Sequence, residues 1–120
     1  MLAGKRILII EDEPLIGLDL ESAIKDGSGI VVGIVTTVAT AMQTIENETL
    51  HGAILDLRLK NELALPLMEQ LAARNIPFVI HSGQADHSIA TAWPSVPIIN
   101  KPALPENVIA ALAVAISDHR

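Results

Sequence analysis

Short apolar runs alternate along the chain with longer segments in which apolar residues recur at helical spacing. The apolar runs are rich in Ile and Val and show no polar alternation, which is typical of strands buried on both faces of a sheet. Strands are therefore predicted at Ile7–Ile10, Ile30–Val35, Gly52–Leu57, Phe78–Ile80 and Val96–Ile99.

The segment after the first apolar run shows how the intervening helices begin and end. Glu11–Pro14 places acids and a proline where helix N-termini favour them, and Gly27–Gly29 provides a stop about four turns later. A first helix is expected between these two signals. The same reasoning predicts helices at about Val38–Glu48, Glu62–Arg74, Asp86–Trp93 and Pro105–Ser117.

Five repeats of strand then helix predict an α/β fold. Right-handed crossovers between parallel strands place helices on both faces of the sheet, so we expect a three-layer sandwich around a parallel five-stranded sheet. No linker or low-complexity segment interrupts the pattern, and residues 1–120 are expected to form a single domain. In such sheets ligands bind outside the carboxyl ends of the strands, where the chemistry is expected.

Composition narrows the classes of function. Half of the 120 residues are hydrophobic, enough for one core, and the net charge of -6 leaves no basic stripe for nucleic acid. The chain has no cysteine, and its first residues do not resemble a targeting segment. The longest apolar stretch, Val108–Ile116, is shorter than the roughly 18 residues that a membrane span requires. We expect a cytoplasmic protein that binds neither nucleic acid nor membrane.

Polar residues lie at the carboxyl ends of four of the predicted strands. Glu11 and Asp12 come after the first, Asp56 lies near the end of the third, Ser82 follows the fourth and Lys101 follows the fifth. Because parallel strands end at one edge of a sheet, these groups are expected to converge. Asp56 stands within an apolar run, where a carboxylate without a partner would be costly.

A divalent cation would explain the carboxylates. Asp12 and Asp56 would repel each other in one cleft, and Mg²⁺ favours hard oxygen ligands together with a phosphate oxygen. Lys101 would then offset charge on transferred phosphoryl oxygens, while the Ser82 hydroxyl would donate a hydrogen bond to one of them.

Each motif alone has a structural interpretation. Glu11-Asp12 resembles a helix-capping turn, Asp56 could be satisfied by backbone N–H groups, Ser82-Gly83 is a common turn, and Lys101-Pro102 is typical of a solvated loop. Chance placement of all these groups at successive strand ends is improbable, and this favours the functional interpretation.

Together these residues resemble the response-regulator receiver family. The likeness comprises the acids after Ile7–Ile10, Ala53–Asp56, Ser82-Gly83 and Asn100–Pro102, and it covers essentially the whole chain. The resemblance implies a flavodoxin-like (βα)5 fold with strand order 2-1-3-4-5. It also implies a phosphoprotein of a two-component system or phosphorelay that catalyses only its own phosphorylation and dephosphorylation.

The resemblance assigns a role to each matching residue. It implies that Asp56 accepts a phosphoryl group from a kinase phosphohistidine. Asp12 and Asp56 would bind Mg²⁺ directly, Glu11 would bind it through water, and the carbonyl of Arg58 would complete the protein ligands.

The family pattern also implies phosphoryl-binding and tuning residues. Ser82 and Lys101 would bind the phosphoryl group, and the side chains of Arg58 and Gln84 would set how fast water removes it. Many members carry an aromatic switch residue at the position of Ile98. The usual coupling of hydroxyl movement to rotation of this aromatic side chain is therefore in doubt here.

Two further departures concern the loops. Lys60 replaces a common proline after the phosphoacceptor. Gln84–Pro97 is short for a full helix with its connections, and Trp93-Pro94 suggests an early break, as in a subgroup with a degenerate fourth helix and stand-alone members.

The expected partners are a sensor histidine kinase or a histidine phosphotransfer protein, and a downstream protein or a second copy of the chain. One alternative is a pseudo-receiver that keeps the fold without accepting phosphate. Another is a flavodoxin-like binder or enzyme, although Gly27–Gly29 lacks dinucleotide spacing and Arg58 stands where aspartyl phosphatases carry a second acid. A fragment of a longer protein is also compatible with the sequence.

Overall fold

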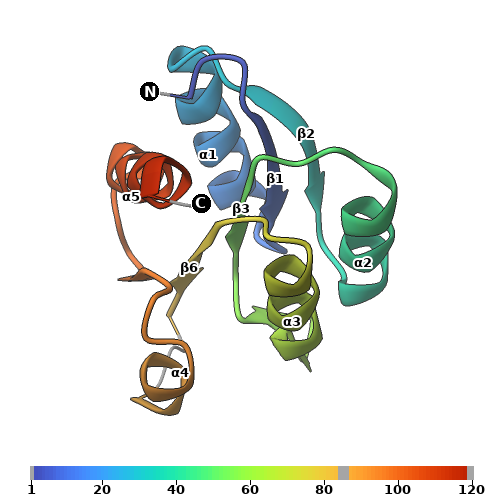
Figure 1. Ribbon diagram of the computed structural model, residues 1–120. Coiled ribbons are helices and arrows are strands. Elements are labelled where there is room, and N and C mark those ends of the chain that lie inside the picture. Colours follow the sequence, from blue (N-terminus) through green and yellow to red (C-terminus); the bar gives the residue numbers. More distant parts are fainter. Residues whose placement is uncertain (1, 84–86, 119–120) are drawn as a thin grey trace.

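A central sheet of five parallel strands organises the chain in a computed structural model that describes residues 2–83 and 87–118. The strands are β1 (Arg6–Ile10), β2 (Ile30–Val35), β3 (Gly52–Leu55), β6 (Phe78–Ser82) and β7 (Ile98–Asn100). Their order is β2-β1-β3-β6-β7 (Figure 1). This confirms the predicted order 2-1-3-4-5, counted over the strands of this sheet.

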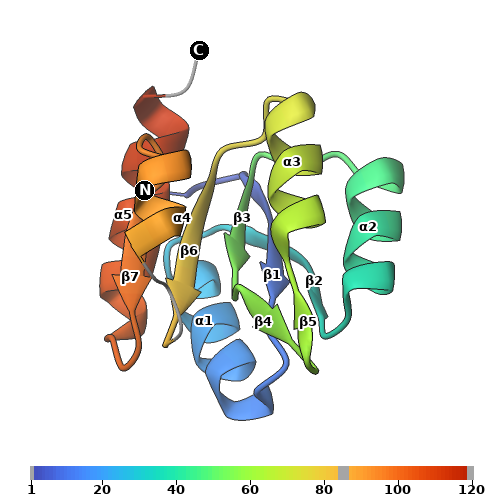
Figure 2. The same cartoon turned by 90° about the horizontal axis from the view of Figure 1, so that it is seen from below.

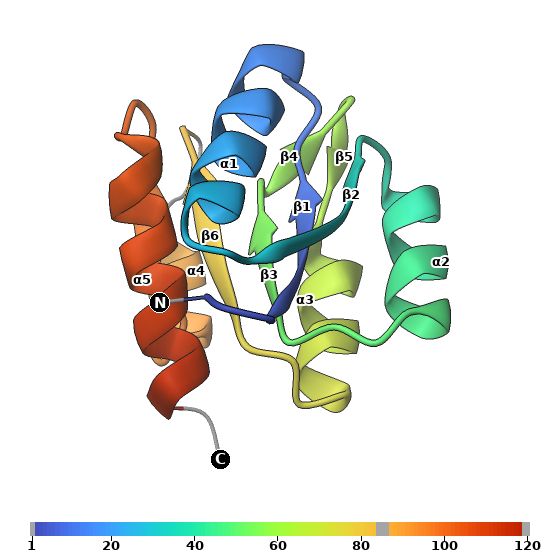
Figure 3. The same ribbon diagram turned by 90° about the horizontal axis from the view of Figure 1, so that it is seen from above.

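Helices cover both faces of the sheet. They are α1 (Pro14–Asp26), α2 (Val38–Asn47), α3 (Leu65–Ala73), α4 (His87–Ala92) and α5 (Pro105–Asp118). α1 and α5 pack together on one face, whereas α2 and α3 pack on the other (Figures 1 and 3). The predicted three-layer α/β sandwich is confirmed. Within the described ranges, none of these helices has the length and apolarity needed to span a bilayer.

Alternation along each strand divides the core into two clusters. On β1, Ile7 and Ile9 face α1 and α5, whereas Leu8 and Ile10 face α2 and α3. All four side chains are fully buried because successive residues point to opposite faces of a sheet that is covered on both. The lack of polar alternation in the sequence follows directly from this arrangement.

A small antiparallel hairpin corrects the predicted helix at Glu62–Arg74. β4 (Arg58–Leu59) pairs with β5 (Glu62–Leu63) through a two-residue loop of Lys60 and Asn61, and α3 begins only at Leu65. Both loop residues have positive φ, 45° and 70°, as expected for the hairpin turns that match strand twist. The hairpin projects beyond the end of β3 (Figures 2 and 3).

The ends of three other elements also differ from expectation. β3 stops at Leu55, so Asp56 follows the strand directly, and β6 extends to Ser82 through pairing with Asn100 of β7. β7 itself begins at Ile98 rather than Val96. α4 has six residues, consistent with the early break expected at Trp93-Pro94.

Candidate functional site

The carboxyl ends of β1, β3, β6 and β7 lie beside one another (Figure 2). Residues that follow these ends line a cleft of about 420 Å³. These four strands are consecutive neighbours in the sheet, which explains why their carboxyl ends lie together. Five of the predicted site residues line the cleft: Asp12, Asp56, Arg58, Ser82 and Lys101.

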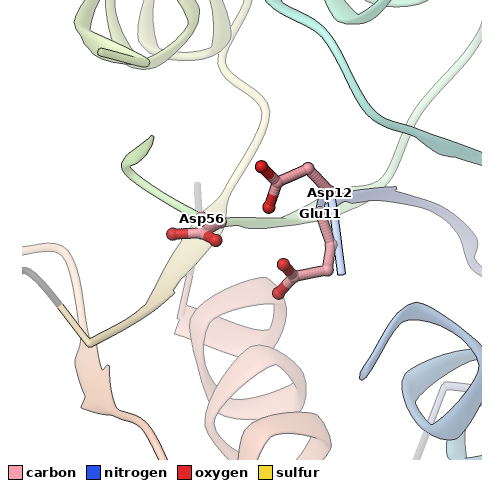
Figure 4. A group of neighbouring side chains, drawn as sticks. All are labelled: Glu11, Asp12 and Asp56. Atoms are coloured by element: carbon pink, nitrogen blue, oxygen red, sulfur yellow. The ribbon is translucent and has the colours of Figure 1, made fainter. Parts of the chain in front are cut away.

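Three carboxylates form the acidic centre of the site. Glu11 and Asp12 extend from the end of β1 towards Asp56, which follows β3 (Figure 4). One oxygen from each side chain lies within 4.8 Å of the others. A backbone hydrogen bond holds Asp56 beside the end of β1, since the Asp56 N–H donates to the Ile10 carbonyl at 2.9 Å.

Lys101 contacts most of this negative charge. Its Nζ lies 3.0 Å from Glu11 Oε1, 3.1 Å from Asp56 Oδ2 and 3.3 Å from Glu13 Oε1. Burial alone would lower the pKa of Lys101, but hydrogen bonds to Glu11 and Asp56 outweigh it and raise the pKa above its usual range. The ammonium group therefore stays protonated.

Glu11 is the most buried acid of the three. Its side chain is only 2 % exposed, and burial raises its pKa to about 7 despite the hydrogen bond from Lys101. The nearby carboxylate of Asp56 acts in the same direction. A bound cation would oppose both effects because it favours the ionised form.

Backbone N–H groups bind the other two carboxylates. The N–H of Arg58 donates to Asp56 Oδ1 at 3.3 Å, and the N–H of Lys60 donates to Asp12 Oδ2 at 2.9 Å. The β4–β5 hairpin thus orients Asp12 and Asp56, whereas Lys101 neutralises Asp56 and Glu11.

The donor set fits Mg²⁺. Three carboxylates within 4.8 Å offer the hard oxygen ligands that this ion prefers, and the cleft beside them has room for the waters that it retains. Glu11 and Asp56 already neutralise part of their charge through Lys101, so a cation would compete with the ammonium group for the same oxygens.

Of three further positions named from the sequence, the structure describes two. Ser82 is fully buried at the end of β6 and reaches the cleft. Ile98 begins β7 and packs, partly buried, against the core on the α2 and α3 face. Gln84 lies outside the described residues.

Sequence reasoning missed Glu13 and Lys60. The third acid of Glu11-Asp12-Glu13 could have been noticed as a partner for Lys101 because it stands in the same strand-end run. The Lys60 backbone N–H carries no side-chain signal, and its bond to Asp12 spans 48 positions of sequence.

The raised pKa of Glu11 predicts that the affinity of this site for Mg²⁺ depends on pH. At about pH 6, most Glu11 is protonated, so we expect Mg²⁺ to bind up to about tenfold more weakly than at about pH 8. Without the ion, Glu11 affects the stability of the fold in the opposite direction. Its pKa is higher in the folded state than the unfolded value of 4.5, so protonation of Glu11 stabilises the fold fully below about pH 4.5. This stabilisation is lost as pH rises through about 7.

Urea unfolding with and without Mg²⁺ at both pH values would measure the two effects. The stabilisation that Mg²⁺ provides should increase with pH in the wild type and vary much less in Glu11→Gln. Equal pH dependence in both proteins would assign the titration to another group.

A comparison with known protein families shows to which family the chain belongs. A family model described as the response regulator receiver domain matches residues 7–113. The chain belongs to this family. A receiver domain is a signalling module rather than a conventional enzyme, and the acidic centre at the strand ends is where receiver domains typically bind Mg²⁺.

Several solved structures resemble the chain over almost its whole length. SdrG from Sphingomonas melonis Fr1 is 38 % identical, with a TM-score of 0.82, and the match covers 98 % of this chain and 99 % of SdrG. PhyR from Brucella abortus is 28 % identical, with a TM-score of 0.82, over 97 % of this chain and 49 % of PhyR. A CheY-like receiver from Methanospirillum hungatei JF-1, at 21 % identity and a TM-score of 0.85 over 97 % of this chain and 96 % of that one, supports the fold. No curated protein matches the chain.

Proposed function

We propose that Asp56 accepts a phosphoryl group from the phosphohistidine of a sensor histidine kinase or a histidine phosphotransfer protein. The observation that carries the proposal is the contact of a buried strand-end carboxylate, Asp56, with the Lys101 ammonium at 3.1 Å beside two further acids. A structural carboxylate would need one partner, whereas this cluster gathers more negative charge than Lys101 neutralises.

The transfer needs a nucleophile and charge neutralisation. The phosphorus–nitrogen bond of the phosphohistidine breaks as a phosphorus–oxygen bond to Asp56 forms, and the imidazole leaves with the electron pair. Lys101 would contact a phosphoryl oxygen after a small movement, because its Nζ already lies 3.1 Å from Asp56 Oδ2. Mg²⁺ held by Glu11, Asp12 and Asp56 would neutralise charge on the transferred group.

The other site residues would stabilise the product. Ser82 would donate its hydroxyl hydrogen to a phosphoryl oxygen, and movement at the end of β6 would alter the surface of the loops after it. The carbonyl of Arg58 would add a ligand to the ion, and its exposed side chain, together with Gln84, would control how water approaches the phosphoryl group. We propose that the resulting surface binds a protein partner, either a downstream protein or a second copy of the chain.

Acetyl phosphate tests the proposal without a cognate kinase. We expect wild-type protein with Mg²⁺ to gain the mass of one phosphoryl group, and hydroxylamine to remove it, because acyl phosphates are labile to this nucleophile. Chelation of the ion with EDTA should prevent the adduct. Absence of an adduct from acetyl phosphate, phosphoramidate and a phosphorylated histidine phosphotransfer protein would contradict the proposal and favour a pseudo-receiver.

A further inference from the structure

Glu13 is a contact of Lys101 that the receiver pattern does not require. Its Oε1 accepts a hydrogen bond from Lys101 Nζ at 3.3 Å. The backbone of Glu13 is held at both ends, since its N–H donates to Glu11 Oε2 at 3.2 Å and its carbonyl accepts from Gly17 at 3.0 Å. The side chain therefore extends towards Lys101 from a fixed point at the start of α1.

The three acids that pair with Lys101 among the described residues differ in what a bound cation would do to them. Glu11 and Asp56 belong to the acidic centre, so Mg²⁺ would draw their oxygens away from the ammonium group. Glu13 is not part of that cluster, and its side chain is 61 % exposed. With the cation in place, Glu13 is the carboxylate left to neutralise Lys101.

A neighbouring groove gives an unanchored Lys101 somewhere to move. Glu13 and Lys101 line the cleft of the site and also a second groove of about 400 Å³, which extends between α1 and the start of α5. Ile16, Pro102 and Ala103 supply apolar walls of this groove. The ion pair of Glu13 with Lys101 therefore borders both spaces.

We propose that Glu13 is a positioning residue that holds the Lys101 ammonium towards Asp56 when a divalent cation occupies the acidic centre. The inference rests on the proposed function of Asp56. Glu13 does not compete with the phosphoryl group, because an ammonium has three N–H donors and can keep one on Glu13 while another reaches a phosphoryl oxygen. Glu13 thus maintains the catalytic amine in place between rounds of phosphorylation.

Chemical labelling of lysine tests the position of Lys101 without any phosphorylation. An amine-reactive acetylating reagent is applied with and without Mg²⁺, and labelling at Lys101 is measured by peptide mass spectrometry, with exposed Lys25 as an internal reference. In Glu13→Ala we expect labelling of Lys101 to rise by at least about threefold with Mg²⁺, because the ion pair that holds the ammonium group is lost, and to change little without it. Glu13→Gln, which keeps the size of the side chain, should give a smaller rise in the same direction.

Asp19→Asn is the matched control. Asp19 is an acid of α1 that lines the same groove, but among the described residues it forms no ion pair with Lys101. Its loss should leave the labelling unchanged in both conditions. An unchanged rate in Glu13→Ala with Mg²⁺, an equal rise with and without the ion, or an equal rise in Asp19→Asn would each overturn the inference.

Phosphorylation kinetics give an independent readout. Under saturating Mg²⁺, Glu13→Ala should accept phosphate from acetyl phosphate about two- to fivefold more slowly than wild type, and the difference should vanish in a Lys101→Met background. Faster phosphorylation, or an equal decrease in the Lys101→Met background, would contradict the positioning role. If the wild type accepts no phosphate, the proposed function fails, whereas the labelling result still decides where Glu13 holds Lys101.

Discussion

Asp56→Asn should abolish the phosphoryl adduct, a decrease of at least about 100-fold relative to wild type. Asn keeps the size and shape of the side chain but replaces the nucleophilic carboxylate with an amide. Intact mass after incubation with acetyl phosphate and Mg²⁺ measures the change. Asp56 is only 6 % exposed, lies beside Lys101 and lines the cleft, whereas Glu11, which is also buried beside Lys101, is not among the lining residues.

An exposed acid of the hairpin provides the control. Glu62 lies on β5, near the cleft but outside its lining, and Glu62→Gln should be phosphorylated at the wild-type rate. An undiminished adduct on Asp56→Asn would place the acceptor on another side chain, and peptide mapping would then identify it. Loss of the adduct in both variants would indicate a general effect of charge.

Leu67→Ala should lower the free energy of unfolding by about 3 kcal/mol, the largest stability effect that we expect from a single side chain here. Leu67 is fully buried on α3, where it packs in the cluster beneath the α2 and α3 face. Truncation removes apolar contacts and leaves a cavity that rigid neighbours cannot fill. Urea unfolding followed by circular dichroism would measure the loss, which is a large share of the roughly 5–15 kcal/mol typical of a domain.

Leu63→Ala is the matched comparison. Leu63 is 53 % exposed on β5, so its truncation should change the free energy of unfolding by less than about 0.5 kcal/mol. A cost below about 1 kcal/mol for Leu67→Ala would mean that α3 does not pack on the sheet as described.

The sheet could be predicted because its signal is local and repeated. Ile7–Ile10 and the other strands consist mainly of apolar residues suited to a sheet with two covered faces, and short connections between them leave few alternatives to right-handed crossovers. The β4–β5 hairpin could not be predicted in the same way. Its turn uses Lys60 and Asn61 instead of Asn-Gly or Asp-Gly, and its strands have two residues each. The helix predicted from Glu62 therefore includes the two residues of β5.

The site was predictable as a set of residues but not as a set of contacts. Strand order alone brings Asp12, Asp56 and Lys101 to one edge, since each follows a strand of the same parallel sheet. The distribution of hydrogen bonds around Lys101 depends on side-chain conformation, which periodicity does not specify. The contact with Glu13 and the support of Asp12 by the hairpin therefore emerged only from the three-dimensional arrangement.

The edge-to-face packing of Trp93 on Phe78, with ring centroids 6.1 Å apart, gives the molecule a natural optical probe. Trp93 is the sole tryptophan, and the chain has no tyrosine, so emission excited in the near ultraviolet reports on one place. Phe78 begins the strand that ends at Ser82. A change of Trp93 fluorescence when a cation binds at the acidic centre would thus show that binding at one end of β6 alters the structure at the other end. No attached label is needed for this measurement.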